Sequence, residues 1–158
     1  MTAVAWSDAL AVSTALGAAV VAGIFFAFST FVMKALGRLP PAHGIAAMQS
    51  INTAVLNPWF FAVFFGTALG AAVLGLLGLL SWGTSESAFL FAGSVLYLIG
   101  CIVVTIGLNV PLNNELAVIQ PGATQSAETW ARYLSLWTTW NHLRTVASLA
   151  AAASFLAT

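Results

Sequence analysis

Long runs of apolar residues leave this chain few ways to fold. Hydrophobic residues make up 61% of its 158 positions, and only 5% are charged. A soluble domain of this length needs roughly a quarter of its residues charged to cover its surface. A run of about 20 apolar residues can instead cross the hydrocarbon core of a bilayer as a helix. The sequence therefore predicts an all-α, polytopic membrane protein whose main partner is the lipid bilayer.

Four such runs predict an antiparallel bundle of four transmembrane helices in a single domain, residues 1–158. The expected spans are approximately 9–33, 58–82, 88–110 and 134–156. Asn57 and Pro58 suit the N-cap and the first helical position of the second span. Pro111 is expected to end the third span, and the fourth is expected to begin as a more polar helix near Ser126. Short amphipathic helices are expected on the cytoplasmic side.

The basic residues predict the orientation of these spans. Lys34 and Arg38 follow the first span, whereas Arg132 and Arg144 lie in or just after the connection between the third and the fourth. Because cytoplasmic connections of membrane proteins carry the excess of Lys and Arg, the first and third connections are expected in the cytoplasm. Both termini are then external to the cell (inner) membrane.

Charge and small residues also bear on the partners. The net charge is zero and no Lys/Arg cluster occurs, which argues against a nucleic-acid partner. Gly66 and Gly70 are spaced so that helix backbones can approach closely in lipid. This pair could serve the core of the bundle or a homo-oligomer equally well.

The segment 137–144 (WTTWNHLR) is the most polar stretch beside a span. Polar groups close to lipid usually face the interior of a bundle or a cavity, because contact with acyl chains is costly. On a helix, Trp137, Asn141 and Arg144 share one face, with His142 at its edge. Such a face suits a flat, partly polar ligand. Anchoring at the headgroups is an alternative explanation of Trp137 and Trp140.

Further amides are expected on the same side of the membrane. Asn109 and Asn113 flank Pro111, where the amides can satisfy backbone groups freed by the proline. Gln49 and Asn52 lie in the first connection. All four are candidates for binding a substrate.

His142 has three interpretations: an interfacial histidine, a general base, or a ligand of a metal or haem. Two histidines and one carboxylate, His43, His142 and Glu115, also match the ligand types of a non-haem iron site. The three come from separate segments without diagnostic spacing. No metal is therefore expected, although haem or a non-haem metal remains an alternative.

Four motifs resemble the DUF1772 integral membrane proteins, which are grouped with fungal anthrone oxygenases. They are residues 25–29 (FFAFS), 45–52 (IAAMQSIN), 109–113 (NVPLN) and 137–144 (WTTWNHLR). The resemblance covers nearly the whole chain and implies a four-helix membrane protein. For some members it implies oxidation of a polyketide anthrone to an anthraquinone by O2, without a dedicated organic cofactor.

The expected chemistry follows from the acidity of the benzylic CH2 of an anthrone. A base can generate an electron-rich enolate that passes an electron to O2, and the protein must supply a base and donors for the enolate oxygen. The residues assigned to these roles are His142 as base, Arg144 and Asn141 for the enolate, Trp137 and Trp140 as walls, and Asn109 and Asn113 for the carbonyl. Two alternatives are a haem-, metal- or quinone-binding redox protein and a non-enzymatic small-molecule-binding or accessory membrane protein.

Overall fold

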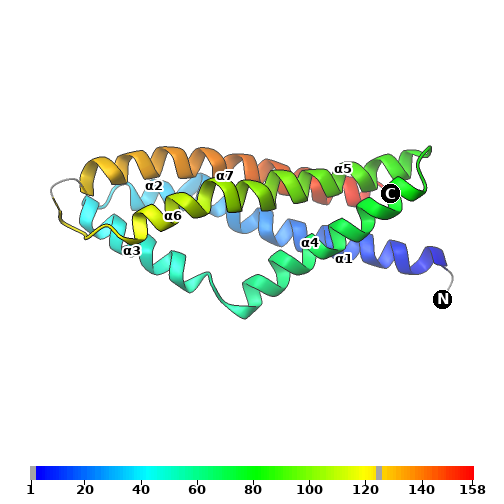
Figure 1. The fold of residues 1–158 in the computed structure, drawn as a ribbon, viewed down its shortest axis with the longest axis horizontal. Coiled ribbons are helices and arrows are strands. Elements are labelled where there is room, and N and C mark those ends of the chain that lie inside the picture. Colours follow the sequence, from blue (N-terminus) through cyan, green and yellow to red (C-terminus); the bar gives the residue numbers. More distant parts are fainter. Residues whose placement is uncertain (1–2, 124–125) are drawn as a thin grey trace.

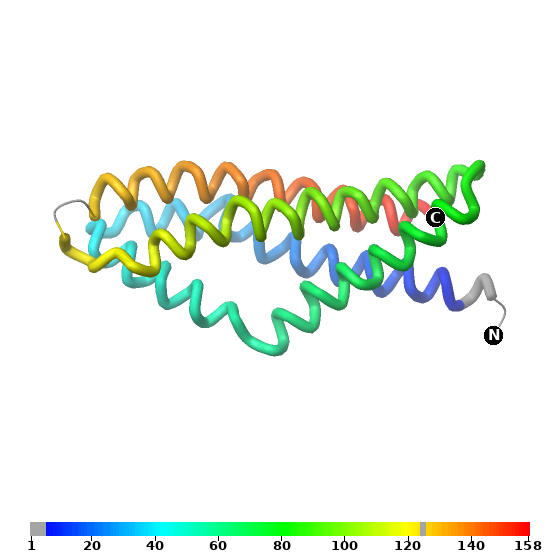
Figure 2. Tube along the Cα trace, viewed as in Figure 1, coloured from blue at the N-terminus to red at the C-terminus, as the bar shows by residue number. Residues whose placement is uncertain are grey.

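The chain is helical throughout the part that the structure describes, as the sequence predicts. A computed structural model describes residues 3–123 and 126–158, and side chains from Trp6 onward. Within these ranges the helices are joined by short turns, and no β-strand occurs. Both ends of the chain lie at one end of an elongated bundle (Figures 1 and 2).

The first half of the chain forms two long helical stretches and a shorter helix between them. Helix α1 (Ala3–Ala27) continues through the π-helical segment η1 (Phe28–Val32) into α2 (Met33–Leu36). Helix α3 (Pro41–Ala54) follows, and then α4 (Pro58–Leu80). The side chain of Asn57 accepts a hydrogen bond from the backbone N–H of Phe60, so the predicted N-cap is confirmed.

The third stretch is longer than predicted. Helix α5 (Ser85–Tyr97) runs through the π-helical segments η2 (Leu98–Val103) and η3 (Thr105–Asn109) into α6 (Val110–Ala117). The expectation that Pro111 ends this span is wrong, because the helix continues for another turn and a half beyond it. A proline removes a donor from the regular ladder, and here the π-helical turns before it already interrupt that ladder. Helix α7 (Ser126–Leu156) begins at the predicted residue.

The long helices pack side by side. Helix α1 contacts α4 and α7, and α5 contacts the same two helices from the other side (Figure 1). Within the described residues, three stretches are long and apolar enough to cross a membrane: Trp6–Leu36, Pro58–Leu80 and Ser85–Ala117. At the end of the bundle opposite the termini, α3 packs on α6 and α7.

Two clusters of buried side chains form the core. The cluster nearer the termini is built largely from alanines with Phe64, Tyr97 and Phe155. There α1 and α4 touch closely, because Gly17 faces the side chain of Thr67 and Gly70 faces that of Thr14. The second cluster, at the opposite end, surrounds aromatic residues of α7.

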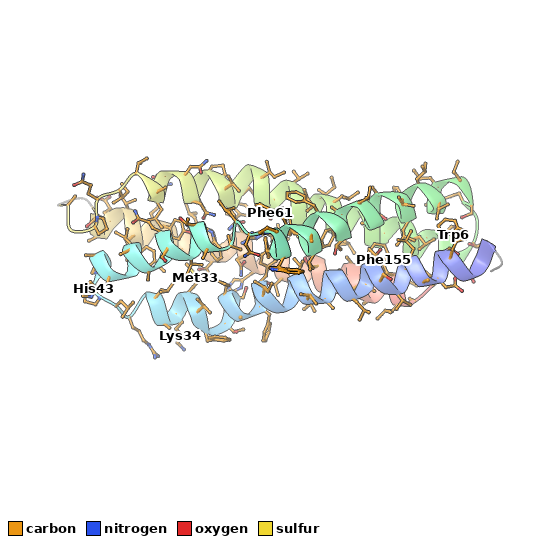
Figure 3. The ribbon with its side chains drawn as sticks, turned by 90° about the horizontal axis from the view of Figure 1, so that it is seen from below. Trp6, Met33, Lys34, His43, Phe61 and Phe155 are labelled. Carbon is orange, nitrogen blue, oxygen red and sulfur yellow. The ribbon has the colours of Figure 1, made fainter. Side chains whose placement is uncertain are left out.

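Helices α3 and α4 meet at an elbow formed by Val55, Leu56 and Asn57. The two helices form a V whose tip stands away from the other helices, about midway along the bundle (Figure 1). Figure 3 shows Phe61 just after this elbow, with His43 and Lys34 at one end of the molecule and Trp6 at the other. The candidate site lies beside this elbow, and Val55 and Leu56 contribute to its lining.

Candidate functional site

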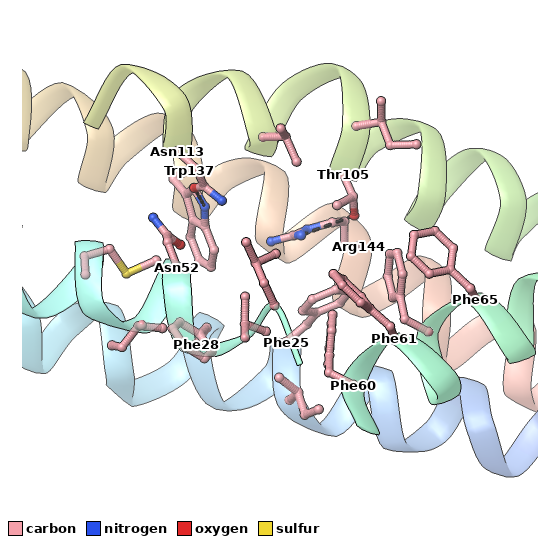
Figure 4. Close-up of a pocket in the computed structure, with 18 residues that line it drawn as sticks. Phe25, Phe28, Asn52, Phe60, Phe61, Phe65, Thr105, Asn113, Trp137 and Arg144 are labelled. Atoms are coloured by element: carbon pink, nitrogen blue, oxygen red, sulfur yellow. Dashed lines mark hydrogen bonds between the residues drawn. The ribbon is translucent and has the colours of Figure 1, made fainter. Parts of the chain in front are cut away.

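A pocket of about 200 Å³ lies between the elbow and the other helices (Figure 4). Its walls are almost entirely apolar, and phenylalanines from α1, η1 and α4 contribute much of them. These are Phe25, Phe28, Phe60, Phe61, Phe64 and Phe65. Opposite them, the lining includes the indole of Trp137 and four polar side chains: Asn52, Thr105, Asn113 and Arg144. The pocket thus has mainly aromatic and aliphatic walls and a small number of polar side chains in its lining.

Arg144 is the most unusual member of this set. Its side chain is 4% exposed, although it carries a full positive charge. Nη2 donates to Oδ1 of Asn141 at 2.7 Å, and Nη1 donates to Oγ1 of Thr105 at 3.2 Å. The guanidinium lies 4.1 Å from the ring centre of Phe25 and 5.1 Å from that of Trp137.

The charge of Arg144 is not neutralised by a carboxylate in the part of the chain that the structure describes. The ion pair found among the described residues joins Arg132 to Glu115, and both side chains lie on the surface. Nε of Arg144 is buried and has no hydrogen-bond partner in the described part of the chain. Burying an unpaired charge is costly. A guanidinium held this way beside a pocket is arranged to receive an anionic oxygen.

Asn141 holds Arg144 in place and does not line the pocket. Its Nδ2 donates to the carbonyl of Phe25 at 2.7 Å and to Oγ of Ser29 at 2.8 Å. Its Oδ1 therefore faces the guanidinium of Arg144 as an acceptor. Every polar atom of this buried amide is used to join α7 to α1 and to orient the cation.

Asn113 presents a donor to the pocket. Its Oδ1 accepts hydrogen bonds from the hydroxyl of Tyr133 and from Nε1 of Trp137, both at 2.8 Å. Because an indole N–H can only donate, the amide oxygen must face it. The Nδ2 group is left without a partner among the described residues. Asn52 supports this arrangement by donating to the hydroxyl of Tyr133 at 3.4 Å.

Two other predicted amides bind the backbone. Nδ2 of Asn109 donates to the carbonyl of Trp137 at 3.2 Å, and the side chain is buried outside the pocket lining. Gln49 donates to the carbonyls of Leu116 and Ile119, both at 2.9 Å. Leu116 lies in the last turn of α6 and Ile119 just beyond it, so the side chain of Gln49 caps the C-terminal end of this helix.

His142 and Trp140 are not brought to the pocket. His142 is exposed, Trp140 is half-buried, and neither lines the cavity. The physical reason is the 100° rotation per helical residue, which turns His142 away from the face that carries Asn141 and Arg144. The structure therefore offers no contact through which His142 could act as base on a ligand in this pocket.

The histidine and carboxylate side chains considered as an iron site are not assembled. Among the described residues, no group of three His, Cys, Asp or Glu side chains could hold a metal ion. His43 is exposed, and Glu115 is paired with Arg132. The polar groups of the pocket are amides, a hydroxyl and a guanidinium, which do not fit the ligand set of haem or non-haem iron.

Sequence reasoning missed several contributors to the site. Tyr133 is buried and orients Asn113, whereas its place near the membrane boundary suggests an aromatic anchor. Thr105 lies in an apolar span and accepts from Arg144. The paired phenylalanines of α4, 60–61 and 64–65, recur at helical spacing directly after the N-cap. That pattern was an available signal, but it also fits an ordinary lipid-facing helix.

Comparison with known proteins identifies the family. The sequence model of the anthrone oxygenases matches residues 59–154, which is more than half of the chain. This region contains Asn113, Trp137 and Arg144, while Phe25 and Asn52 lie before it. No curated protein and no solved structure matches the chain. The resemblance suggested by the four motifs is confirmed, and the chain belongs to the anthrone oxygenase family.

Proposed function

We propose that this protein is a membrane-embedded oxygenase that oxidises a flat, anthrone-like aromatic molecule with O2, without a metal or organic cofactor. Membership of the family supports an oxygenase-like function in a membrane. The observation that carries the proposal is the buried guanidinium of Arg144, which faces an aromatic pocket and has no carboxylate partner among the described residues.

The three apolar stretches and the family indicate a membrane location. We propose that α7 is a fourth span. Its buried face carries Asn141, Arg144 and Ser148, whereas the large side chains exposed beyond His142 are apolar: Leu143, Val146, Leu149 and Leu156. A helix that is polar inside and apolar outside is suited to lipid rather than water. The end with Lys34, Arg38 and Arg132 is then cytoplasmic.

The pocket suits a ligand made of fused aromatic rings. A cavity of about 150 Å³ lined by apolar side chains is large enough to bind benzene. The present pocket, at about 200 Å³, is only somewhat larger, so a fused-ring ligand would fill it and extend into its open side, where Phe61 and Phe65 are exposed. Its phenylalanines and Trp137 can pack against ring faces and edges. Arg144 would bind the oxygen of the substrate, and Asn113 offers a second donor through its unpartnered Nδ2.

The reaction begins with loss of a proton from the benzylic CH2 of the anthrone, which places negative charge on the carbonyl oxygen. Arg144 stabilises that charge in a largely apolar pocket, where such interactions are stronger than in bulk water. The pocket lining contains no His, Asp or Glu. We therefore propose that a water molecule in the pocket accepts the proton, and that His142 takes no part in this step.

The remaining steps use only O2. The enolate transfers one electron to O2, and the resulting carbon radical and superoxide combine to a peroxide at the former CH2 carbon. Transfer of the second C–H proton to the departing oxygen, with cleavage of the O–O bond, gives the second carbonyl and releases hydroxide, which takes up the first proton to form water. Overall, one anthrone and one O2 give one anthraquinone and one water. The protein contributes enolate stabilisation and an apolar enclosure for both reactants.

The test combines turnover with analysis of the purified protein in detergent. Quinone formation is followed by absorbance and O2 uptake by an electrode, and one O2 is expected per quinone. A 300–700 nm spectrum and metal analysis of the same sample are expected to show neither a Soret band nor stoichiometric iron or copper. Stoichiometric metal or haem would overturn the cofactor-free reaction. Tight binding of an anthrone without turnover would instead indicate a non-enzymatic binding protein.

A further inference from the structure

Several side chains that line the pocket are also exposed on the outside of the bundle. They belong to the elbow, the first two turns of α4, and the facing stretch of η3 and α6, and together they form what we term the side opening: Leu56, Phe61, Phe65, Ile106 and Val110. All five are apolar. The polar side chains of the pocket, Asn52, Thr105, Asn113 and Arg144, are less exposed than these five.

The side opening lies at the depth of a membrane interface. Helix α4 is apolar enough to cross a bilayer and begins at Pro58, so the elbow marks one end of a spanning segment. Phe65 is seven residues further on, which places it about 10 Å deeper at 1.5 Å per residue. Trp59, beside the elbow, is 85% exposed. An indole projecting at the end of a span is typical of the boundary between headgroups and acyl chains.

The exposed surface around the side opening is continuous with the lipid-facing surface of the same helix. Ile99 and Ile106 are seven residues apart on the α5–α6 stretch, and their exposed fractions are 56% and 59%. Val103, between them, is also exposed, so exposed apolar side chains continue along this stretch from Ile99 to Ile106. Ile106 lines the pocket and Ile99 does not.

We infer that the side opening faces the acyl chains just below the headgroups, and that the pocket receives its substrate from the bilayer. This inference rests on the proposed function for the identity of the substrate. A lipophilic aromatic molecule dissolved in the membrane would pass between Phe61 and Ile106. Its rings would then remain in an apolar environment until its oxygen reaches Arg144.

Spin labelling tests the location of the side opening without any need for turnover. In a Cys101→Ala background, a nitroxide is attached to a cysteine introduced at position 56, 106, 99 or 43, in vesicles of phosphatidylcholine and phosphatidylglycerol. Labels at 56 and 106 are expected to collide with lipid-soluble O2 more than with a water-soluble nickel chelate, as at 99. The label at 43, which replaces the exposed His43 at the polar end of the molecule, is expected to collide more with the nickel chelate than with O2. Labels at 56 and 106 that behave like the label at 43 would overturn the inference.

A matched pair of variants tests access. Ile106→Trp places a bulky side chain in the side opening, whereas Ile99→Trp makes the same change on the same helix away from it. For an anthrone supplied in vesicles, kcat/KM is expected to fall about tenfold in Ile106→Trp and to stay at the wild-type value in Ile99→Trp. Equal kcat/KM in both variants would refute access through this opening. Absence of turnover in the wild type would refute the proposed function, and the spin labels would still test the opening.

Discussion

Arg144→Met is the most informative substitution, because it removes the charge and keeps most of the side-chain volume. The guanidinium donates to Asn141 at 2.7 Å and to Thr105 at 3.2 Å, and it packs on the rings of Phe25 and Trp137. If Arg144 stabilises the enolate oxygen, its loss is equivalent to removing a donor from an oxyanion hole. Such removal lowers kcat about 10²- to 10³-fold.

The same substitution is expected to leave the fold intact. Loss of two hydrogen bonds, and an unsatisfied Oδ1 on Asn141, destabilise the variant by about 1–3 kcal/mol. Replacing a buried charge by an apolar side chain offsets this, since such replacements are often neutral or stabilising. We therefore expect the free energy of unfolding to change by less than about 2 kcal/mol, so that activity is lost from a folded protein.

The assay is quinone formation from an anthrone under air, with thermal unfolding in the same detergent as a check of the fold. Arg144→Lys keeps the charge but not the planar fork, so its activity should lie between those of wild type and Arg144→Met. Arg132→Met and His142→Ala are controls, because one removes an exposed ion pair and the other an exposed side chain outside the pocket. A folded Arg144→Met that retains more than a tenth of the wild-type kcat would refute the reasoning.

Three further predictions concern stability, measured as thermal or denaturant unfolding in detergent. Gly44→Ala should destabilise the protein by about 1–3 kcal/mol, because a Cβ there would lie 2.7 Å from the ring of Trp130. Gly66→Ala is the control and should be neutral or slightly stabilising, because no atom lies within 4 Å of a Cβ at that position. Equal effects of the two variants would contradict the close packing of Gly44 on Trp130. Asn141→Leu should destabilise the protein by several kcal/mol, because it removes the hydrogen bonds to Phe25 and Ser29 and the acceptor for Arg144. An unchanged unfolding midpoint would count against a stabilising role of these hydrogen bonds. Asn57→Ala should cost about 1 kcal/mol through loss of the N-cap of α4, and no loss would show that the cap is not formed.

Much of the helical architecture could be predicted from local sequence. Asn57 followed by Pro58 predicts the start of α4, because capping and proline geometry depend only on neighbouring residues. The prediction that Pro111 ends its helix was wrong because this outcome does not depend on neighbouring residue types alone. Whether a proline ends a helix depends on how the turns before it are arranged, and the π-helical turns of η3 are not apparent from composition.

The site was predicted in part. Helical spacing correctly places Trp137, Asn141 and Arg144 on one buried face. It cannot say which polar group on that face meets the cavity and which meets a neighbouring helix. Asn141 bonds to the backbone of Phe25, more than a hundred residues away in the chain, and this contact takes it out of the pocket. His142 differs from it by one residue and lies on the exposed side.

The sequence by itself determined that this chain is a helical membrane protein with its polar side chains concentrated near one segment. That follows because the hydrophobic effect and backbone hydrogen bonding act on every apolar run in the same way. Only the tertiary structure decided that a pocket forms beside the elbow before Pro58, that phenylalanines of α1 and α4 line it, and that Arg144 faces it with no carboxylate partner among the described residues. These features depend on which helices pack together, and such contacts join residues that local patterns cannot relate.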